Sequence, residues 1–453
     1  MTAERTLFAK VWDAHRVRDL PGNNALIFID RTVVYELLGP PAIEQIETRY
    51  GGALYDPRRL VAVNDHVVPA KDSSTAEQAQ VLRTWARKRG VLLYDVGENG
   101  ICHVLVPERG LVVPGSTVVC SDSHTCTLGA FGAFAFGVGS TALAGAMLSG
   151  ATIVARPKVM RVFVRSRLQG GATAKDLALG VVARLGFKGG TGYVLEFAGD
   201  CIAALSMEER MTLCNMAIEA GATTGICAVD EVTISYMRGR EFSPGGEAFE
   251  RAAAAWRTLV ADDGAAYDAE LRIDAGELVP TVTWGTNPGQ SAPLEGIVPH
   301  DAEPAALAYM ELEPGTPLRS IALDQAFIGS CTNARIGDLR AAAAVLAGRK
   351  VAIPTIVTPG SQAVKRQAER EGLHDVFQDA GALWTHATCG ACPGLSTGVL
   401  APGMRCISST NRNFPGRMGA GGRVHLASPV VVAASAVMGR IASPSELEAP
   451  VLA

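Results

Sequence analysis

Short apolar runs alternate with amphipathic stretches along most of the chain, and this alternation predicts an α/β protein. Apolar runs rich in branched residues indicate buried strands, and longer stretches with apolar positions three to four apart indicate helices. The strands predicted in this way are 25–30, 117–120, 159–164, part of 319–328 and 351–357, and the helices are 41–50, 174–185 and 338–348. Ligands of such proteins usually bind at the carboxyl ends of the strands, so functional side chains are expected there.

One apolar stretch, residues 128–155, carries no charged residue and is long enough to span a bilayer. Six glycines interrupt it, and it directly follows the polar cluster SDSHTCT. A buried, glycine-rich loop that leads into a core helix fits this composition better than a membrane span. The N-terminal segment is charged and amphipathic and lacks the apolar core of a secretory signal, so we expect a cytoplasmic protein with no membrane partner.

The same stretch contains GVGSTA, residues 137–142, which matches the glycine fingerprint of dinucleotide-binding folds. That fingerprint also needs an acidic residue about twenty positions later, on the next strand. The segment that follows, ATIVARPKVMRVFVRSRL, contains none. The glycines are therefore expected to allow tight turns and close packing, and an NAD-linked oxidoreductase stays open as an alternative.

Composition narrows the class of protein further. The 453 residues are 48% hydrophobic and 19% charged, which is enough apolar material for several buried cores. The net charge is −4 and aromatic residues make up 6%, so nothing in the sequence indicates a nucleic-acid partner. With domain boundaries near residues 160 and 285, we expect three α/β domains over 1–160, 161–285 and 286–453.

Ten cysteines are spread irregularly, and most are expected to be buried free thiols in a reducing compartment. Three of them form a distinct pattern: Cys331 in FIGSCTNARIGDLR, then Cys389 and Cys392 in HATCGACPG. Three thiolates at this spacing suit an iron–sulfur cluster that keeps one iron open for substrate. The small residues around them allow backbone N–H groups to approach an anionic cluster. A structural zinc site with His386 as the fourth ligand and a redox dithiol are the alternatives.

Several polar groups interrupt apolar surroundings elsewhere in the chain. They are Asp65 and His66 after LVAV, His103 after a glycine turn, Asp122, Ser123 and His124 after VVC, Glu196 within YVLEFA, and Asn411, Arg412 and Arg417 in SSTNRNFPGRMG. Any one of them alone is more often structural, as a helix cap or one half of an ion pair. Together they supply acids, bases and anion-binding arginines, which suit the reversible addition of water to an unsaturated polycarboxylate.

The ordered set of motifs resembles the aconitase superfamily, and most closely the large subunit of 3-isopropylmalate dehydratase. The resemblance runs nearly from end to end, through TLFAKVWDAH, FIDRTVVYE, NDHVVP, GICHV, CSDSHT, GGTGYVLEF, CNMAIEAGATTG, TWGTNPG, GSCTNARIGDLR, CGACPG, TNRNFPGR and GGRVHLASP. It implies a three-domain aconitase-like core around a 4Fe–4S cluster. It also implies a hydro-lyase acting on a small hydroxy-dicarboxylate, with 2-isopropylmalate to 3-isopropylmalate in leucine biosynthesis as the favoured reaction. Homocitrate or homoaconitate, citrate and methylmalate-type compounds are the alternative substrates.

The resemblance also implies roles for individual residues. Cys331, Cys389 and Cys392 would hold one cluster per subunit, with the fourth iron open. Proton handling would fall to Asp65, His66, His103, Asp122 and His124. Glu196 would hydrogen-bond the departing water or hydroxyl group. Ser123, Arg412 and Arg417 would bind substrate carboxylates, and Asn333 and Asn411 would support the cluster.

Two departures from the family pattern bear on function. Longer members continue into a fourth, swivelling domain with the catalytic serine base, whereas this sequence stops at Ala453, so we expect a small-subunit partner that supplies both. The segment YELLGPPAIEQI lacks the histidine, threonine and glutamine that the family commonly has at Tyr35, Leu38 and Pro41. A proline cannot make the hydrogen bonds of an amide side chain, so the identity of the hydroxy acid stays open. The acidic balance argues against the RNA-binding role that a cluster-free relative can adopt.

Overall fold

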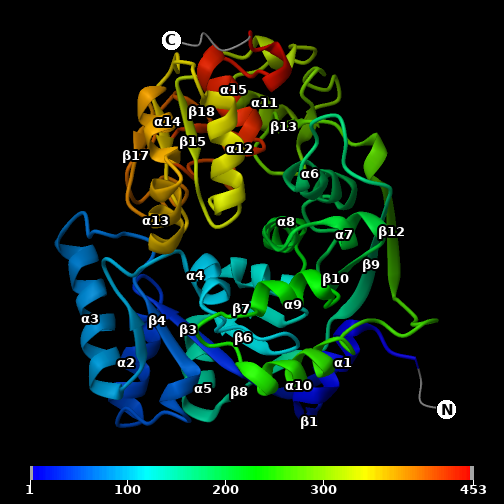
Figure 1. Cartoon of the computed structure of the whole chain (residues 1–453), viewed down its shortest axis with the longest axis vertical. Helices are drawn as coiled ribbons and strands as arrows, with labels where there is room; N and C mark the ends of the chain where they lie inside the picture. The colour runs from blue at the N-terminus through cyan, green and yellow to red at the C-terminus, as the bar shows by residue number, and fades with distance from the viewer. Residues whose placement is uncertain (1–3, 449–453) are drawn as a thin grey trace.

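The computed structural model describes residues 4–448 and arranges them in five sheets covered by helices (Figure 1). The three largest sheets contain only parallel strands, as expected where helices form the crossovers. They come from successive parts of the chain. In Figure 1 the first lies at the bottom, the second at the right and the third at the top.

The first parallel sheet has the strand order β5-β4-β3-β6-β7. Its strands are β3 (Arg31–Tyr35), β4 (Leu60–Val63), β5 (Leu92–Tyr94), β6 (Thr117–Cys120) and β7 (Phe134–Gly137). One face packs under α2 (Pro40–Arg49), α3 (Ser73–Arg89) and α5 (Ser140–Ser149), and the other faces α4 (Cys102–Glu108). Alternate residues of β3 therefore enter different cores: Val34 packs with Leu82, whereas Val33 and Tyr35 pack on the side of Leu105.

The second parallel sheet has the order β11-β10-β9-β12. Its strands are β9 (Lys158–Arg165), β10 (Tyr193–Ala198), β11 (Thr224–Cys227) and β12 (Ala269–Asp274). One face packs against α6 (Ala174–Leu185), α7 (Asp200–Ala204) and α8 (Met207–Met216), and the other against α1 (Leu7–His15). Residue 160, where the sequence analysis places a domain boundary, lies within β9.

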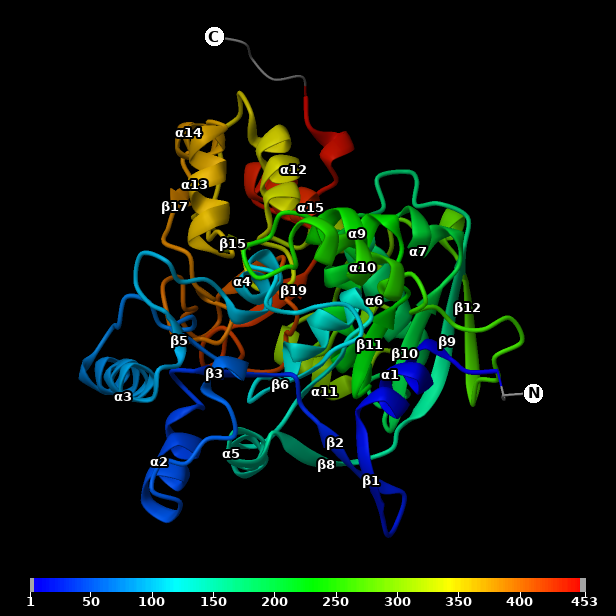
Figure 2. The same ribbon diagram turned by 60° about the horizontal axis from the view of Figure 1, so that its bottom comes forward.

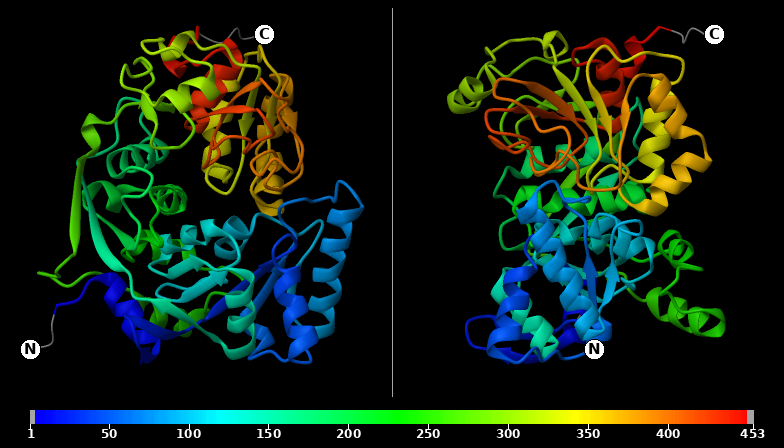
Figure 3. Two further views of the ribbon diagram at one scale, coloured as in Figure 1. Left: turned by 180° about the vertical axis from the view of Figure 1, so that it is seen from behind. Right: turned by 90° about the vertical axis from the view of Figure 1, so that its left-hand side faces the viewer.

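The third parallel sheet has the order β17-β16-β15-β18-β19, and Figure 3 shows it opposite the first sheet. Its strands are β15 (Gln325–Ile328), β16 (Thr355–Val357), β17 (Leu383–Trp384), β18 (Arg405–Ser408) and β19 (Arg423–Leu426). The helices around it are α12 (Ile336–Leu346), α13 (Gln362–Arg370), α14 (Leu373–Asp379) and α15 (Pro429–Met438). Both faces are buried, because Ile328 and Ile407 enter one core while Phe327 and Cys406 enter the other.

Smaller elements connect these layers. Two antiparallel sheets join β1 (Arg16–Leu20), β2 (Asn24–Phe28) and β8 (Ala151–Ala155), and β13 (Thr281–Thr283) with β14 (Ser291–Pro293). The remaining helices are α9 (Glu231–Met237), α10 (Gly246–Trp256) and α11 (Pro304–Met310), with 3-10 turns η1 (Pro57–Arg59), η2 (Ser123–Phe131), η3 (Ala217–Ala220), η4 (Ala275–Glu277), η5 (Leu318–Ser320) and η6 (Pro444–Glu446). Within residues 4–448, every helix is too short or too polar to cross a membrane.

The predicted elements agree with the structure where the pattern was regular. Helix 174–185 and strand 117–120 have the predicted bounds. The stretch 128–155 folds into the end of η2, then β7, α5 and β8, as a buried glycine-rich segment leading into a helix. The strand predicted over 351–357 begins only at Thr355, because Pro354 cannot donate a ladder hydrogen bond. In 319–328 only the last four residues are a strand.

The third group of elements contacts the other two groups; Figure 2 shows the same ribbon from another side. The amide of Ile101, at the start of α4, donates to Gly360 O at 2.8 Å, and Gly100 pairs with Ser361. From the second group, Thr212 Oγ1 donates to Thr332 O at 2.9 Å. His66 after β4 lies 3.6 Å from Asp122 after β6, and Asn411 after β18 lies 3.3 Å from Cys331 after β15, so the loops that follow these strands contact one another in two pairs.

A pH-dependent ion pair joins α1 to the start of β3. His15 Nε2 lies 2.8 Å from Asp30 Oδ2. Burial alone would lower the pKa of His15, but the hydrogen bond and charge of Asp30 raise it above its usual range. Burial alone would raise the pKa of Asp30, but His15 and the Thr117 amide lower it.

We expect this pair to stabilise the fold by about 1 kcal/mol near pH 5. The histidine contribution is complete below its unfolded pKa and is lost as the pH rises through the raised folded pKa. The aspartate contribution is lost only as the pH falls through its lowered folded pKa. A double-mutant cycle of His15→Gln and Asp30→Asn, followed by urea unfolding, should give a larger coupling energy at pH 5 than at pH 9. Equal coupling at both values would contradict this assignment.

Candidate active site

Three buried thiols meet between the first and third sheets. Cys331 follows β15, and Cys389 and Cys392 lie in the turn after β17; their residues are 5%, 7% and 4% exposed. One side chain touches two of them: Asn411 Nδ2 lies 3.3 Å from Cys331 Sγ, and Asn411 Oδ1 lies 3.7 Å from Cys392 Sγ. The long sequence separation between the first cysteine and the pair is thus closed by the fold.

The backbone before Cys331 adopts an unusual conformation. Ser330 has φ +78°, in the left-handed region that non-glycine residues rarely occupy. Its Oγ lies 3.6 Å from Cys392 Sγ and 3.9 Å from Cys331 Sγ. Strain of this kind persists only where the surroundings enforce it, and here it marks the point at which β15 delivers its cysteine.

The donor set fits a cluster better than a single zinc ion. Two sulfurs bound to one zinc at about 2.3 Å lie at most roughly 4.6 Å apart. Among residues 4–448, the only trio of His, Cys, Asp or Glu donors that all lie within 4.8 Å of one another is Asp65, His66 and Cys389, so the three cysteine sulfurs are spread more widely. The zinc alternative with these cysteines does not fit this spacing.

Burial and neighbouring negative charge keep the thiols of Cys331 and Cys389 protonated in the absence of a metal centre. Burial, followed by the negative charges of Asp122 and Cys392, raises the pKa of Cys331 to about 11. Burial and Asp65 raise the pKa of Cys389 well above its usual range. A bound metal centre would offset this, because coordination deprotonates a thiol outright. Three N–H donors and one O–H donor already approach the sulfurs. Asn215 and Asn411 lie 3.1 and 3.3 Å from Cys331 Sγ, and Arg417 and the Ser330 hydroxyl lie 3.4 and 3.6 Å from Cys392 Sγ.

Asp122, directly after β6, is the centre of the polar network. Its carboxylate lies 3.0 Å from His103 Nε2, 3.4 Å from His124 Nδ1 and 3.6 Å from His66 Nε2. Burial alone would raise the pKa of Asp122, but His103, then His124 and His66, hold it well below its usual range. Its carboxylate is therefore charged at neutral pH, with three imidazoles directed at it.

Asp65 and His66 form a second charged pair after β4. Asp65 is fully buried; one carboxylate oxygen contacts His66 Nδ1 and the other accepts the Cys102 N–H at 3.0 Å. Burial alone would lower the pKa of His66, but the carboxylates of Asp65, Asp122 and Glu36 raise it well above its usual range. His66 thus carries a proton at neutral pH, and Asp65 fixes its orientation.

Glycine at position 137 allows the Asp122 turn to form. A Cβ at Gly137 would lie 2.8 Å from Asp122 O and 2.9 Å from Ser123 Cα, so any side chain there would push the turn away. Ser123 begins η2 next to Asp122 and is half-buried. Gly137 of the dinucleotide-like fingerprint therefore serves close packing of this turn, whereas a Cβ at Gly139 would meet no atom within 4 Å.

Two residues of the site escaped the sequence analysis: Asn215 and Glu219. Glu219 is buried and lies 2.8 Å from His124 Nε2, and it accepts from Arg412 Nε at 2.7 and 3.0 Å. Both residues lie within the motif CNMAIEAGATTG, four positions apart where α8 passes into η3, so they share one helical face. The spacing of an amide and an acid four positions apart, in an otherwise apolar motif, is the sequence feature that indicates these two site residues.

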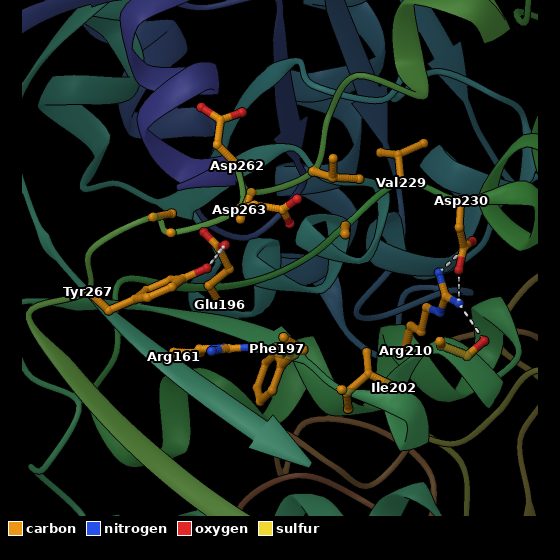
Figure 4. Close-up of a pocket in the computed structure, with 18 residues that line it drawn as sticks. Arg161, Glu196, Phe197, Ile202, Arg210, Val229, Asp230, Asp262, Asp263 and Tyr267 are labelled. Carbon is orange, nitrogen blue, oxygen red and sulfur yellow. Dashed lines mark hydrogen bonds and ion pairs between the residues drawn. The ribbon is translucent and has the colours of Figure 1, made fainter. Parts of the chain in front are cut away.

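Glu196, predicted to hydrogen-bond the departing hydroxyl, is held elsewhere. Its carboxylate accepts the N–H groups of Leu7 and Phe8 at 3.3 and 3.1 Å and the Tyr267 hydroxyl at 2.8 Å. Figure 4 shows it beside Tyr267 in a cavity of about 480 Å³, which also contains Arg161 and Asp263. The reason is the alternation of β10: Val194 and Glu196 face α1, whereas Leu195 and Phe197 enter the core on the other side.

Asn333, predicted to support the cluster, also has other partners. Its Nδ2 donates to Asp338 Oδ1 at 2.9 Å and lies 3.4 Å from Thr212 Oγ1. Asn333 therefore connects the start of α12 to α8. The amide that contacts Cys331 Sγ from this side is that of Asn215. The structure brings together the rest of the predicted set: Asp65, His66, His103, Asp122, Ser123, His124, Cys331, Cys389, Cys392, Asn411, Arg412 and Arg417.

Comparison with known proteins gives the family of the chain. Residues 9–439 match the model of the aconitase family (aconitate hydratase). Among solved structures, aconitase X from Thermococcus kodakaraensis in its holo-form has 15% identity and a TM-score of 0.48, over 90% of this chain and 87% of that one. An NAD-dependent aldehyde dehydrogenase from Burkholderia multivorans has 11% identity and a TM-score of 0.15, over 85% of this chain and 63% of that one. Since the family match spans nearly the whole sequence, the chain belongs to the aconitase family of hydro-lyases.

Proposed function

We propose that this chain is the large subunit of an enzyme like 3-isopropylmalate dehydratase, which converts 2-isopropylmalate to 3-isopropylmalate by loss and re-addition of water. The observation that carries the proposal is the position of three imidazoles around Asp122, next to three convergent buried thiols. Dehydration of a hydroxy acid needs a proton donor for a poor leaving group and fixed positive charge for the carboxylates. Each of these needs has a candidate residue in the site.

A 4Fe–4S cluster would be held by Cys331, Cys389 and Cys392. When bound, such a cluster supplies a Lewis acid at the one iron that lacks a protein thiolate. The protein's own contribution is the set of donors around the sulfurs. Asn215 and Asn411 direct N–H groups at Cys331, and Arg417 directs one at Cys392. Such hydrogen bonds stabilise the thiolate charge and orient the ligands.

His66 is the candidate proton donor. It is protonated, and Asp65 holds its Nδ1 side, which leaves Nε2 directed toward the Asp122 carboxylate at 3.6 Å. A positioned acid of this kind contributes about 10²–10⁴ in rate. His103 and His124 bind the same carboxylate and keep it charged, so a proton released in the site has a nearby acceptor.

Arg412 and Arg417 are the candidate carboxylate binders. Glu219 engages the Nε of Arg412, which leaves the terminal Nη groups available for a substrate carboxylate. Two exposed apolar residues, Leu38 and Pro41, follow Tyr35 at the end of β3. Homocitrate or homoaconitate, citrate and methylmalate-type acids remain the alternative substrates within the proposal.

The proposal includes a small subunit that carries a serine base. Asp122 and Arg412 keep 17% and 24% of their side-chain surface exposed, so the site reaches the surface of this chain. A second subunit seated there would complete the substrate pocket and exclude water. The cytoplasmic location and the place in leucine biosynthesis follow from the same proposal.

Each of the three cysteines should be required for the cluster. We expect serine at Cys331, Cys389 or Cys392 to reduce bound iron and sulfide and to remove the broad visible absorbance, because a hydroxyl is a poor ligand for iron in such a cluster. Cys406→Ser is the matched control, since Cys406 is equally buried in β18 of the same sheet. Full iron and sulfide content in the three variants would refute the ligand assignment.

Glu219 and Glu196 should behave differently on substitution. Glu219→Gln is expected to lower turnover at least tenfold, because a neutral amide orients Arg412 and His124 less well. Glu196→Gln should leave turnover per cluster unchanged and lower the free energy of unfolding by about 1–3 kcal/mol, because it weakens three hydrogen bonds to α1 and Tyr267. The measurements are steady-state kinetics and urea unfolding of both variants. The reverse pattern would restore Glu196 to the active site.

Turnover should require the small subunit. We expect the reconstituted chain alone to be inactive and the complex to convert 2-isopropylmalate, followed by ultraviolet absorbance of the unsaturated intermediate. A panel of citrate, homocitrate and 2-methylmalate identifies the substrate. Robust turnover by the chain alone would contradict the two-subunit proposal, whereas turnover of a panel acid but not isopropylmalate would replace the substrate and keep the reaction.

A further inference from the structure

Two adjacent residues at the end of β3, outside the predicted site, contact His66 and its loop. Tyr35 and Glu36 are 2% and 0% exposed. The Tyr35 ring is stacked on the His66 imidazole, with centroids 4.6 Å apart and planes at 21°. The Glu36 carboxylate accepts three consecutive backbone N–H groups, from Asp65 at 3.0 Å, His66 at 2.7 Å and Val67 at 2.9 Å.

The strand geometry explains how neighbouring residues reach one loop. Tyr35 pairs with Val63 of the parallel strand β4, so the loop that follows β4 lies beside the end of β3. Successive residues of an extended segment point in opposite directions. Tyr35 therefore reaches the imidazole while Glu36 reaches the backbone, and the loop is contacted from two sides.

The carbonyl side of the same loop is held by the segment that carries the thiols. Thr388 Oγ1 donates to Asp65 O at 3.0 Å and lies 2.9 Å from His66 O, and the Cys389 amide donates to Asp65 O at 3.3 Å. The loop thus lies between Glu36 on its N–H side and the residues next to Cys389 on its carbonyl side. Any shift of the end of β3 changes where the imidazole of His66 lies relative to Cys389.

We propose that Tyr35 and Glu36 are positioning residues that set the orientation of His66 relative to the cluster ligands. The inference rests on the proposed function only in that His66 is the proton donor; the hydrogen bonds and the ring stack stand without it. A buried carboxylate next to Asp65 is unfavourable unless donors compensate for it, and its donors are the three amides of this loop. Tyr35 fills the position that the resemblance assigns to a histidine, and a flat ring of either kind provides the stack.

The variants separate positioning from general stability. Glu36→Gln places an amide NH₂ against backbone N–H donors and should displace the loop, and Tyr35→Leu removes the stacked ring. Tyr35→Phe keeps the ring and should retain turnover within about threefold. Asp30→Asn is the control for Glu36→Gln, because Asp30 accepts the Thr117 amide at the opposite end of β3. Tyr94→Leu is the control for Tyr35→Leu, because Tyr94 is equally buried in β5 of the same sheet.

With the cluster-loaded chain and its small subunit, Glu36→Gln and Tyr35→Leu should each lower kcat about 10–100-fold, with KM changed less than about threefold. The two controls should lower the melting temperature by similar amounts and leave kcat per cluster unchanged. Hydrogen–deuterium exchange gives a readout that needs no substrate: peptides covering residues 64–68 should lose protection in Glu36→Gln and keep it in Asp30→Asn.

Each outcome decides the proposal. Unchanged protection at residues 64–68 in Glu36→Gln, or kcat values like those of the controls, would overturn it. Equal damage from Tyr35→Phe and Tyr35→Leu would overturn the role of the ring stack. If the wild-type complex converts no hydroxy acid, the proposed function fails, whereas the exchange experiment still decides whether Glu36 positions the loop. If Glu36→Gln does not fold, Tyr35→Leu and Tyr35→Phe provide the test.

Discussion

The contact of the Asp122 carboxylate with three imidazoles is the interaction on which the site depends. Without such partners the charged form of this half-buried carboxylate would be disfavoured, because removal from water disfavours charge. The histidines that compensate it come from different loops: His66 after β4, His103 in α4 and His124 in η2. Satisfying one charge therefore fixes the relative positions of three chain segments. Further charged groups extend this network: His124 contacts Glu219, and Glu219 contacts Arg412, which follows β18 of the third sheet.

The contacts from Asp122 through His124 and Glu219 to Arg412 join the loops of all three parallel sheets. Parallel strands place their carboxyl ends at one edge, and the loops there carry most of the polar site residues. The thiols come from the third sheet, the proton-handling groups from the first, and Asn215 and Glu219 from the helices of the second. A site assembled in this way has its ion pairs between separate folding elements. Its geometry therefore depends on how the three groups pack, more than on any single element.

Sequence reasoning found the polar residues that lie at the ends of apolar strands. It did not find the direction in which a side chain points, because that direction depends on the packing of the strand. Cys331, Asp65 and Asp122 each follow an apolar run, where functional side chains are expected, and the cysteine spacing and the resemblance suggested their roles. Glu196 also lies near the end of an apolar strand, but the alternation of β10 turns it toward α1. Glu219 lies in a helical turn with no strand before it, so only its spacing from Asn215 indicated a shared face. The left-handed conformation of Ser330 could not be predicted, because it arises from tertiary contacts that outweigh a local preference.

The thiols and the acid–base groups are also mechanically connected. The loop of Asp65 and His66 donates its N–H groups to Glu36 and presents its carbonyls to Thr388 and the Cys389 amide. A change in the position of Cys389 is therefore transmitted through backbone hydrogen bonds to His66, whose imidazole points at Asp122. Such bonds are short and directional, so they constrain the relative positions of the groups that they join. One loop thus joins a residue that would bind a metal centre to the residue that would deliver a proton, and Glu36 at the end of β3 anchors that loop.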